Sequence, residues 1–71
     1  MEVRYRIQHH PGLMTEIMVE YKDGKKQQVE TRYNWAEART YCLGNLKARG
    51  LTDVPIETPE RYVETFPWIT I

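Results

Sequence analysis

Several residue types that carry enzyme chemistry or crosslink small proteins are scarce or missing in this 71-residue chain. It contains no serine nucleophile, and its four glycines are scattered rather than gathered in a phosphate-binding loop. Cys42 is the single cysteine, which excludes an internal disulfide framework and a cysteine-based zinc cluster. No apolar run approaches the roughly 20 residues of a membrane span, and residues 1–8 alternate charged and apolar side chains, unlike a signal peptide. We therefore expect a protein of the reducing cytoplasm that has no membrane partner.

Charge of neither sign dominates, because ten Lys and Arg balance ten Asp and Glu. General nucleic-acid binders gain affinity by neutralising phosphates, so a net charge of zero argues against that class. The balance is uneven along the chain: residues 1–50 carry a net +3 (nine basic, six acidic) and residues 51–71 a net −3 (one basic, four acidic). We expect the acidic segment to pack on the basic body, with recognition of a partner as the alternative.

Three segments show the alternation of apolar and polar side chains that is typical of half-buried strands. They lie around residues 3–7, 17–21 and, more weakly, 29–33. The histidine, proline and glycine residues of 9–12 separate the first two segments, because proline removes a donor and glycine relaxes the backbone limits. A chain of this length forms one domain, so we expect a single small α+β domain over residues 1–71.

The turn between the second and third segments contains Asp23-Gly24, a pair that favours two-residue hairpin loops. Such a loop would oppose the apolar face of one strand to the polar face of the other. A three-residue loop over 22–24, with Gly24 in the left-handed conformation, matches the two apolar faces, and we predict that loop because a one-residue slip inverts every side chain. The expected cross-strand partners are Ile17 with Val29 and Thr15 with Thr31.

The next segment has the features of a capped helix that packs on one face of a three-stranded antiparallel sheet, in the order β-β-β-α. Asn34 is a good N-cap, Glu37 completes a capping box, and Gly50 ends the helix. We expect Arg39 to run along the sheet edge to water and Gly44 to face outward. An α-helix turns by about 100° per residue, and this spacing gathers five residues into one apolar stripe. They are Trp35, Ala38, Cys42, Leu43 and Leu46.

After Gly50 the chain becomes irregular. Thr58 and Pro59 predict a short helix over about residues 59–65. Residues 66–71 hold too many large apolar groups for a disordered tail, so we expect them to pack on the body as an edge strand or an interface. Trp68 is then expected to be largely buried.

The remaining reactive residues do not form a recognisable catalytic or metal site. Cys42 lies on the apolar stripe, which indicates a core residue rather than a nucleophile. His9 and His10 are adjacent, so on a strand they point to opposite faces, and in a solvated turn no third ligand accompanies them. Two carboxylate pairs look structural: Glu16 with Glu20, and Glu60 with Glu64. We therefore predict that the protein is not an enzyme and uses no cofactor and no metal.

Binding through a surface is the function that remains, and two surfaces are candidates. The open face of the sheet is expected to show Arg4, Arg6, Met18, Glu20, Gln28, Glu30 and Arg32. The outer face of the helix is expected to show Glu37, Thr40, Tyr41, Gly44 and Lys47. The residues that we predict to contact a partner are Arg4, Arg6, Glu20, Lys26, Arg32, Tyr41, Gly44 and Lys47. An ordinary solvated surface is the alternative for each face, and an exposed strand edge offers self-association as a third route.

Residues 19–50 resemble, in outline, the arm-binding domain of phage-type tyrosine integrases; they read VEYKDGKKQQVETRYNWAEARTYCLGNLKARG. The matching points are the turn Asp23-Gly24-Lys25 and the helix start Ala36-Glu37-Ala38. In that family a three-stranded sheet packed on a helix enters the DNA major groove. The resemblance therefore implies phosphate and base contacts from Arg4, Arg6, Lys26 and Arg32. Glutamates interrupt this pattern where a DNA reader needs cations, at Glu16, Glu20 and Glu30.

The chain is also similar, in size and in its hairpin-plus-helix build, to small phage proteins that inhibit host machinery, such as anti-CRISPR proteins and polymerase inhibitors. Our first hypothesis is a non-catalytic protein that occupies a surface of a larger protein or nucleoprotein complex, as such an inhibitor does. The alternatives are a nucleic-acid-binding domain that uses the open sheet face, and a structural subunit whose hydrophobic C-terminus completes a homodimer.

Overall fold

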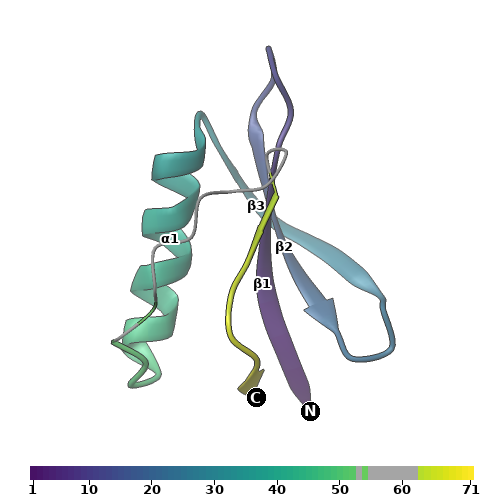
Figure 1. Cartoon of the computed structure of the whole chain (residues 1–71), viewed down its shortest axis with the longest axis vertical. Helices are drawn as coiled ribbons and strands as arrows, with labels where there is room; N and C mark the ends of the chain where they lie inside the picture. The colour runs from purple at the N-terminus through teal and green to yellow at the C-terminus, as the bar shows by residue number, and fades with distance from the viewer. Residues whose placement is uncertain (53, 55–62) are drawn as a thin grey trace.

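A computed structural model of the chain describes residues 1–52, 54 and 63–71 (Figure 1). The elements follow in the order β1 (Glu2–His9), β2 (Thr15–Tyr21), β3 (Lys26–Arg32), α1 (Trp35–Ala48), β4 (Val63–Thr65) and β5 (Ile69–Thr70). The predicted α+β fold, with three antiparallel N-terminal strands and one main helix, is confirmed. Among the described residues, no helix has both the length and the apolar character to cross a lipid bilayer.

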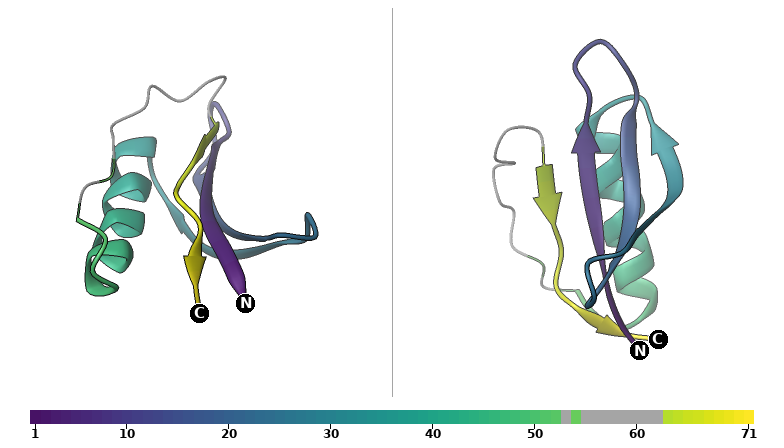
Figure 2. Two further views of the ribbon diagram at one scale, coloured as in Figure 1. Left: turned by 60° about the horizontal axis from the view of Figure 1, so that its bottom comes forward. Right: turned by 90° about the vertical axis from the view of Figure 1, so that its right-hand side faces the viewer.

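β1 lies in the middle of the sheet, so the first residues of the chain organise the fold. The strand order is β3-β2-β1-β4, and β5 pairs with β1 on the same edge as β4. α1 packs across one face of this sheet, and the opposite face is left uncovered by any described element (Figures 1 and 2). Because β5 runs antiparallel to β1, the two ends of the chain meet: the Ile71 N–H donates to the Met1 carbonyl oxygen at 2.9 Å.

The loop between β2 and β3 has the three residues that the sequence predicts. The Gly24 N–H donates to the Tyr21 oxygen at 2.9 Å, and the Tyr21 N–H donates to the Lys25 oxygen at 2.8 Å, so residues 22–24 form the loop. Gly24 has a φ of 92°, in the left-handed region that glycine enters without steric cost. The Asp23 side chain adds a bond from the Lys25 N–H at 2.9 Å, which closes the turn.

Beyond this loop the predicted register fails, because β3 contains a bulge. Met18 pairs with Gln28, but Ile17 pairs with Glu30, so Val29 has no partner of its own on β2. Val29 is consequently 43% exposed rather than packed against Ile17. A bulge adds one residue to one strand and inverts the facing of all residues that follow it.

Because of the bulge, the open face of the sheet contains fewer β3 residues than the sequence predicts. Thr15 pairs with Arg32 rather than with Thr31, so Arg32 lies on the side of the sheet that faces α1. Glu30, the partner of Ile17, turns to the same side. Neither residue therefore belongs to the open face, to which the sequence assigned both.

Hydrogen bonds at both ends of α1 confirm the predicted helix limits. The Asn34 side chain accepts a bond from the Glu37 N–H at 2.8 Å, which satisfies one of the donors that a helix start leaves unpaired. At the other end the Leu51 N–H reaches back to the Leu46 oxygen at 3.0 Å, and the Gly50 N–H also bonds into the last turn at 3.0 Å. With Gly50 at a φ of 86°, this pair of bonds forms a Schellman motif and stops the helix.

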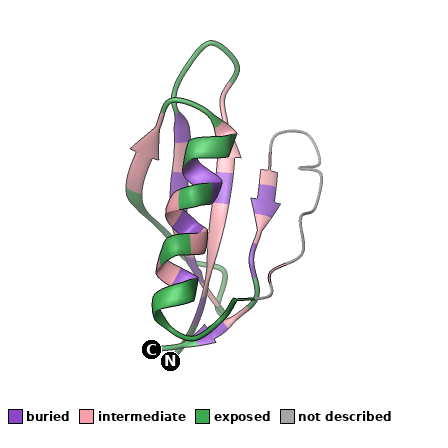
Figure 3. Ribbon diagram, turned by 90° about the vertical axis from the view of Figure 1, so that its left-hand side faces the viewer, coloured by how far each residue is buried: buried purple, intermediate pink, exposed green. Residues whose placement is uncertain are grey.

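The core lies between α1 and the apolar face of β1 and β2. Ile7 and Ile17 face each other across the two strands, and both have 0% exposure. The helix contributes Ala38, Cys42 and Leu46 from the predicted stripe, and its inner side is buried while its outer side is exposed (Figure 3). Each fully buried side chain of the size of Leu46 contributes about 2 kcal/mol to folding. The buried cluster is completed by Val3, Phe66 and Ile69.

Arg39 does not run to water, and this prediction is wrong. The residue is only 7% exposed, and its Nε donates to Oε2 of Glu64 at 3.2 Å. Glu64 is 4% exposed, and its Oε1 accepts a bond from the Trp35 indole N–H at 2.9 Å. Because Glu64 pairs with Ile7, its side chain faces the helix. The sequence reading missed this ion pair because the two partners are separated by 25 residues along the chain.

The C-terminal residues run along β1 as two short strands, in agreement with the expected edge position. The predicted helix over residues 59–65 is wrong for 63–65, which form β4, and residues 59–62 lie outside the described residues. Between β4 and β5, Phe66 is buried with 3% exposure, and its N–H donates to the Tyr5 oxygen at 3.0 Å. Pro67 follows, where its missing donor removes no bond from either strand.

Glu64→Gln is expected to destabilise the protein by about 3 kcal/mol, because it preserves the side-chain shape but removes the buried carboxylate charge that the Arg39 guanidinium contacts. Urea denaturation followed by circular dichroism measures this free energy of unfolding. Glu37→Gln is the matched control, since it neutralises an exposed carboxylate on α1 and should change stability by less than about 1 kcal/mol. Equal stability of Glu64→Gln and the wild type would show that the pair does not hold β4 to the helix.

Candidate functional site

The predicted contact residues are distributed over three parts of the surface instead of forming one site. The open sheet face holds Arg4, Arg6, Glu20 and Lys26. A groove beside the first turns of α1 holds Arg32 and Tyr41. The exposed outer side of α1 holds Gly44 and Lys47, and open space surrounds the position of a Gly44 side chain.

On the open face, Glu20 is the acceptor around which the arginines gather. Arg4, its direct cross-strand partner, donates to the Glu20 Oε2 from Nε at 3.0 Å and from Nη2 at 2.6 Å. The Arg6 Nη1 lies 3.6 Å from the other oxygen of Glu20. Glu20 is only 8% exposed, so long side chains cover much of this face even without a helix above it.

Trp68 joins this arrangement, although the sequence reading did not include it among the contact residues. Its ring centre lies 4.6 Å from the Arg4 guanidinium carbon and 4.1 Å from the Lys22 ammonium nitrogen. These are cation–π distances, and they fix the ring against the sheet. Trp68 is partly buried. Its contacts with Arg4 and Lys22 could not be predicted from the sequence pattern, because they depend on the path of the chain after Pro67.

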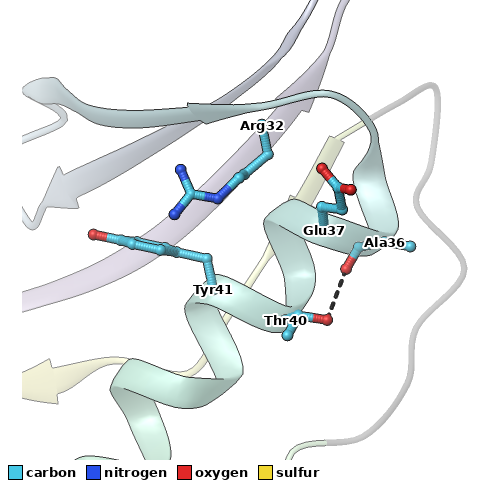
Figure 4. A pocket seen from close by; sticks show the side chains of 5 residues that line it. All are labelled: Arg32, Ala36, Glu37, Thr40 and Tyr41. Carbon is cyan, nitrogen blue, oxygen red and sulfur yellow. Dashed lines mark hydrogen bonds between the residues drawn. The ribbon is translucent and has the colours of Figure 1, made fainter.

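The groove beside α1 has a volume of about 430 Å³ and is lined by Arg32, Ala36, Glu37, Thr40 and Tyr41 (Figure 4). Arg32 crosses from β3, and its guanidinium carbon lies 4.9 Å from the centre of the Tyr41 ring. Glu30 pairs with Arg32 at 2.9 Å. A bond from the Thr31 N–H, and after it the bond from Arg32, lowers the pKa of Glu30 below its ordinary value. The bulge at Val29 builds this groove, because it turns both Glu30 and Arg32 toward the helix side.

Three exposed apolar residues lie at the end of the sheet where the β1–β2 hairpin closes. Leu13 is 72% exposed and Met14 43% exposed in that hairpin loop, and Tyr33 at the end of β3 is 78% exposed. Thr15 pairs with Arg32, so Met14, which precedes β2, and Tyr33, which follows β3, lie at the same end of the sheet. We call Leu13, Met14, Tyr33 and the groove the hairpin-end surface. A sequence signal did exist, since apolar residues next to Pro11-Gly12 must occupy a loop.

The two histidines support this hairpin rather than a metal site. His9 belongs to β1, and its Nδ1 lies 2.7 Å from the Thr15 hydroxyl oxygen across the hairpin. The His10 Nε2 lies 2.9 Å from the Glu16 Oε1. Both rings are therefore bonded within the hairpin, which differs from the solvated turn expected from sequence. Within residues 1–52, 54 and 63–71, no three His, Cys, Asp or Glu side chains are placed to share a metal ion.

Cys42 is buried with 0% exposure, as predicted for a core residue. Desolvation, and after it the nearby Glu64 carboxylate, raise the pKa of the thiol from 9.0 to about 12. Since the thiolate is the nucleophilic form, this side chain is unreactive at neutral pH. Burial likewise raises the pKa of Tyr5 above 10.0.

Comparisons with protein-family models, with curated proteins and with solved structures found no match to this chain.

The stability of the protein is expected to fall as the pH rises above 9. The unfolded thiol of Cys42 ionises near 9.0, whereas the folded one ionises near 12, so its stabilisation is complete below pH 9 and is lost toward pH 12. The loss is about 1.4 kcal/mol per pH unit and is measured by urea denaturation at about pH 8 and about pH 10. Cys42→Ala should lack this component, although loss of packing lowers its baseline. An equal pH dependence in wild type and Cys42→Ala would contradict the assignment.

Proposed function

We propose that the protein is a binding protein that occupies a surface of a larger protein, and that it does so through the hairpin-end surface. The observation that carries this proposal is that Leu13, Met14 and Tyr33 are all exposed at one end of the sheet, the end at which Arg32 also enters a groove of about 430 Å³. Large apolar side chains that are exposed at one place on a surface, rather than scattered singly, mark protein interaction sites. Aromatic residues such as Tyr33 are enriched among the residues that dominate binding energy.

The geometry of this surface suits a protein partner. Arg32 lies over the Tyr41 ring and Glu37 lines the other side of the groove, so polar groups surround an aromatic floor. Such an arrangement resembles the usual anatomy of an interface, in which an apolar centre is enclosed by hydrogen-bonding groups. The hairpin that carries Leu13 is held by side-chain bonds from both histidines, which limits the entropy lost on binding.

The same geometry favours protein over nucleic acid as the partner. Of the cations implied by the integrase resemblance, Arg4 is bonded to Glu20, Arg6 lies beside the same carboxylate, and Arg32 lies on the opposite side of the sheet. Lys26 alone of the four is exposed. A sheet that reads DNA needs several cations free to meet phosphates.

A protein that binds over a functional surface of its partner inhibits the activity that depends on that surface. That mode of action is the one by which a phage-encoded inhibitor of host machinery, such as an anti-CRISPR protein, would work. We place its action in the cytoplasm, a proposal supported by the single thiol of Cys42, which is buried and forms no disulfide.

Crosslinking and capture from the cells that make the protein, followed by calorimetry with the captured protein, tests the proposal. The variant Leu13→Asp/Tyr33→Asp is expected to bind the partner at least about tenfold more weakly than wild type, because it places charges at the centre of the contact. Ile71→Asp is the matched control, since it charges a 55% exposed apolar residue at the chain terminus. Wild-type affinity in the hairpin-end variant would contradict the proposed surface, and capture of no protein by the folded wild type would contradict the function.

Duplex DNA is expected to give no gel shift at low salt, because Glu16 and Glu20 lie among the arginines of the open face and repel a run of phosphates. The assay uses the wild type and Glu20→Gln, which removes the competing carboxylate. A shift of the wild type that weakens steeply with added salt would favour the nucleic-acid-binding alternative.

A further inference from the structure

The open face of the sheet holds more cationic groups than acceptors, at a place distinct from the hairpin-end surface. Arg4, Arg6 and Lys22 lie together there, with Glu20 and Glu2 as their carboxylate partners. The Lys22–Glu2 distance is 3.8 Å, and both side chains are 54% exposed, so this pair is loose. One carboxylate, Glu20, is left to serve two guanidinium groups.

Glu20 satisfies Arg4 and leaves Arg6 short of an acceptor. Both bonds from Arg4, at 3.0 and 2.6 Å, end on the Oε2 of Glu20. The Arg6 Nη1 lies 3.6 Å from Oε1, which is too long for a hydrogen bond. The Arg6 Nε is buried and has no hydrogen-bond partner, while 24% of the side chain remains open to solvent. The buried Nε is closed to an incoming group, so an acceptor reaches Arg6 through the solvent-open part of its side chain.

Trp68 prepares this cluster for binding. Its ring lies 4.6 Å from the Arg4 guanidinium carbon and 4.1 Å from the Lys22 ammonium, so the cations around Arg6 are restrained before any ligand arrives. Side chains that are already ordered lose less entropy when they bind.

We propose that the cluster around Arg6 binds a single carboxylate, supplied by an acidic segment of a partner protein. A guanidinium donates charge-assisted bonds to a carboxylate, so the incoming group supplies an acceptor to the solvent-open part of the Arg6 side chain. Glu16 and Glu20 project from the same face, and they disfavour a run of phosphates while leaving room for one negative group. The occupant is therefore an Asp or Glu side chain rather than a nucleic-acid backbone.

NMR titration of the wild-type protein with a blocked tetraglutamate peptide tests the proposal. The Arg6 Nε–H signal and the Trp68 indole signal, followed at mildly acidic pH and constant ionic strength, are expected to shift together and to saturate. Loss of one signal in Arg6→Gln assigns the Arg6 resonance. The apparent affinity of Arg6→Gln, read from the Trp68 indole, is expected to fall by about tenfold.

Lys25→Gln is the matched control, because it removes the same charge from an 83% exposed side chain in the β2–β3 loop and should weaken binding by less than about twofold. Arg6→Lys, which keeps the charge but loses the planar donor pair, should also bind more weakly than wild type. No saturable shift with tetraglutamate in the wild type would overturn the proposal. Equal weakening by Lys25→Gln would show that the peptide is held by general charge attraction and not by Arg6. Tighter binding of a DNA oligonucleotide, read from the same two signals, would show that the preferred ligand is a phosphate and not a carboxylate.

Discussion

The buried contact between Arg39 and Glu64 is the interaction on which the arrangement of the C-terminal segment depends. β4 has only three residues, and so short a strand has little register preference of its own. Glu64 supplies that preference, because it must face α1 to accept from the Arg39 guanidinium and the Trp35 indole. A slip of one residue along β1 would turn Glu64 outward and break its buried bonds to Arg39 and Trp35, at a cost of several kcal/mol. The polar network therefore specifies position, while the surrounding apolar residues supply most of the stabilisation.

Local chemistry explains which features the sequence could predict. Asn34, Gly24 and Gly50 act within a few residues of themselves, and the structure confirms the cap, the loop and the helix stop that they indicate. Features that depend on distant residues were missed, among them the Arg39–Glu64 pair and the contacts of Trp68. The predicted composition of the open face was wrong for Glu30 and Arg32 for a similar reason, since the prediction assumed an uninterrupted strand.

The bulge at Val29 determines which side chains share a surface. Without it, Arg32 would turn to the open face, and the groove beside α1 would lose the side chain that now crosses to Tyr41. With it, Glu30 and Arg32 pair on the helix side, and the open face keeps a smaller set of charges around Glu20. Bulges commonly redirect side chains at sheet edges, and β3 is such an edge. One extra residue thus separates two chemically different surfaces on a very small protein.

The meeting of the chain ends has a mechanical consequence. Met1 and Ile71 are hydrogen-bonded to each other at one end of the β1–β5 pair. The loop between β1 and β2 lies at the opposite end of the molecule (Figure 1). A force that pulls the two termini apart would act across this antiparallel pair and open its hydrogen bonds one after another, as a zipper opens. A force directed along the strands would instead stress all of these hydrogen bonds at the same time. The fold would then yield to tension from its C-terminal edge, with β5 released before β4 and the ion pair beneath it.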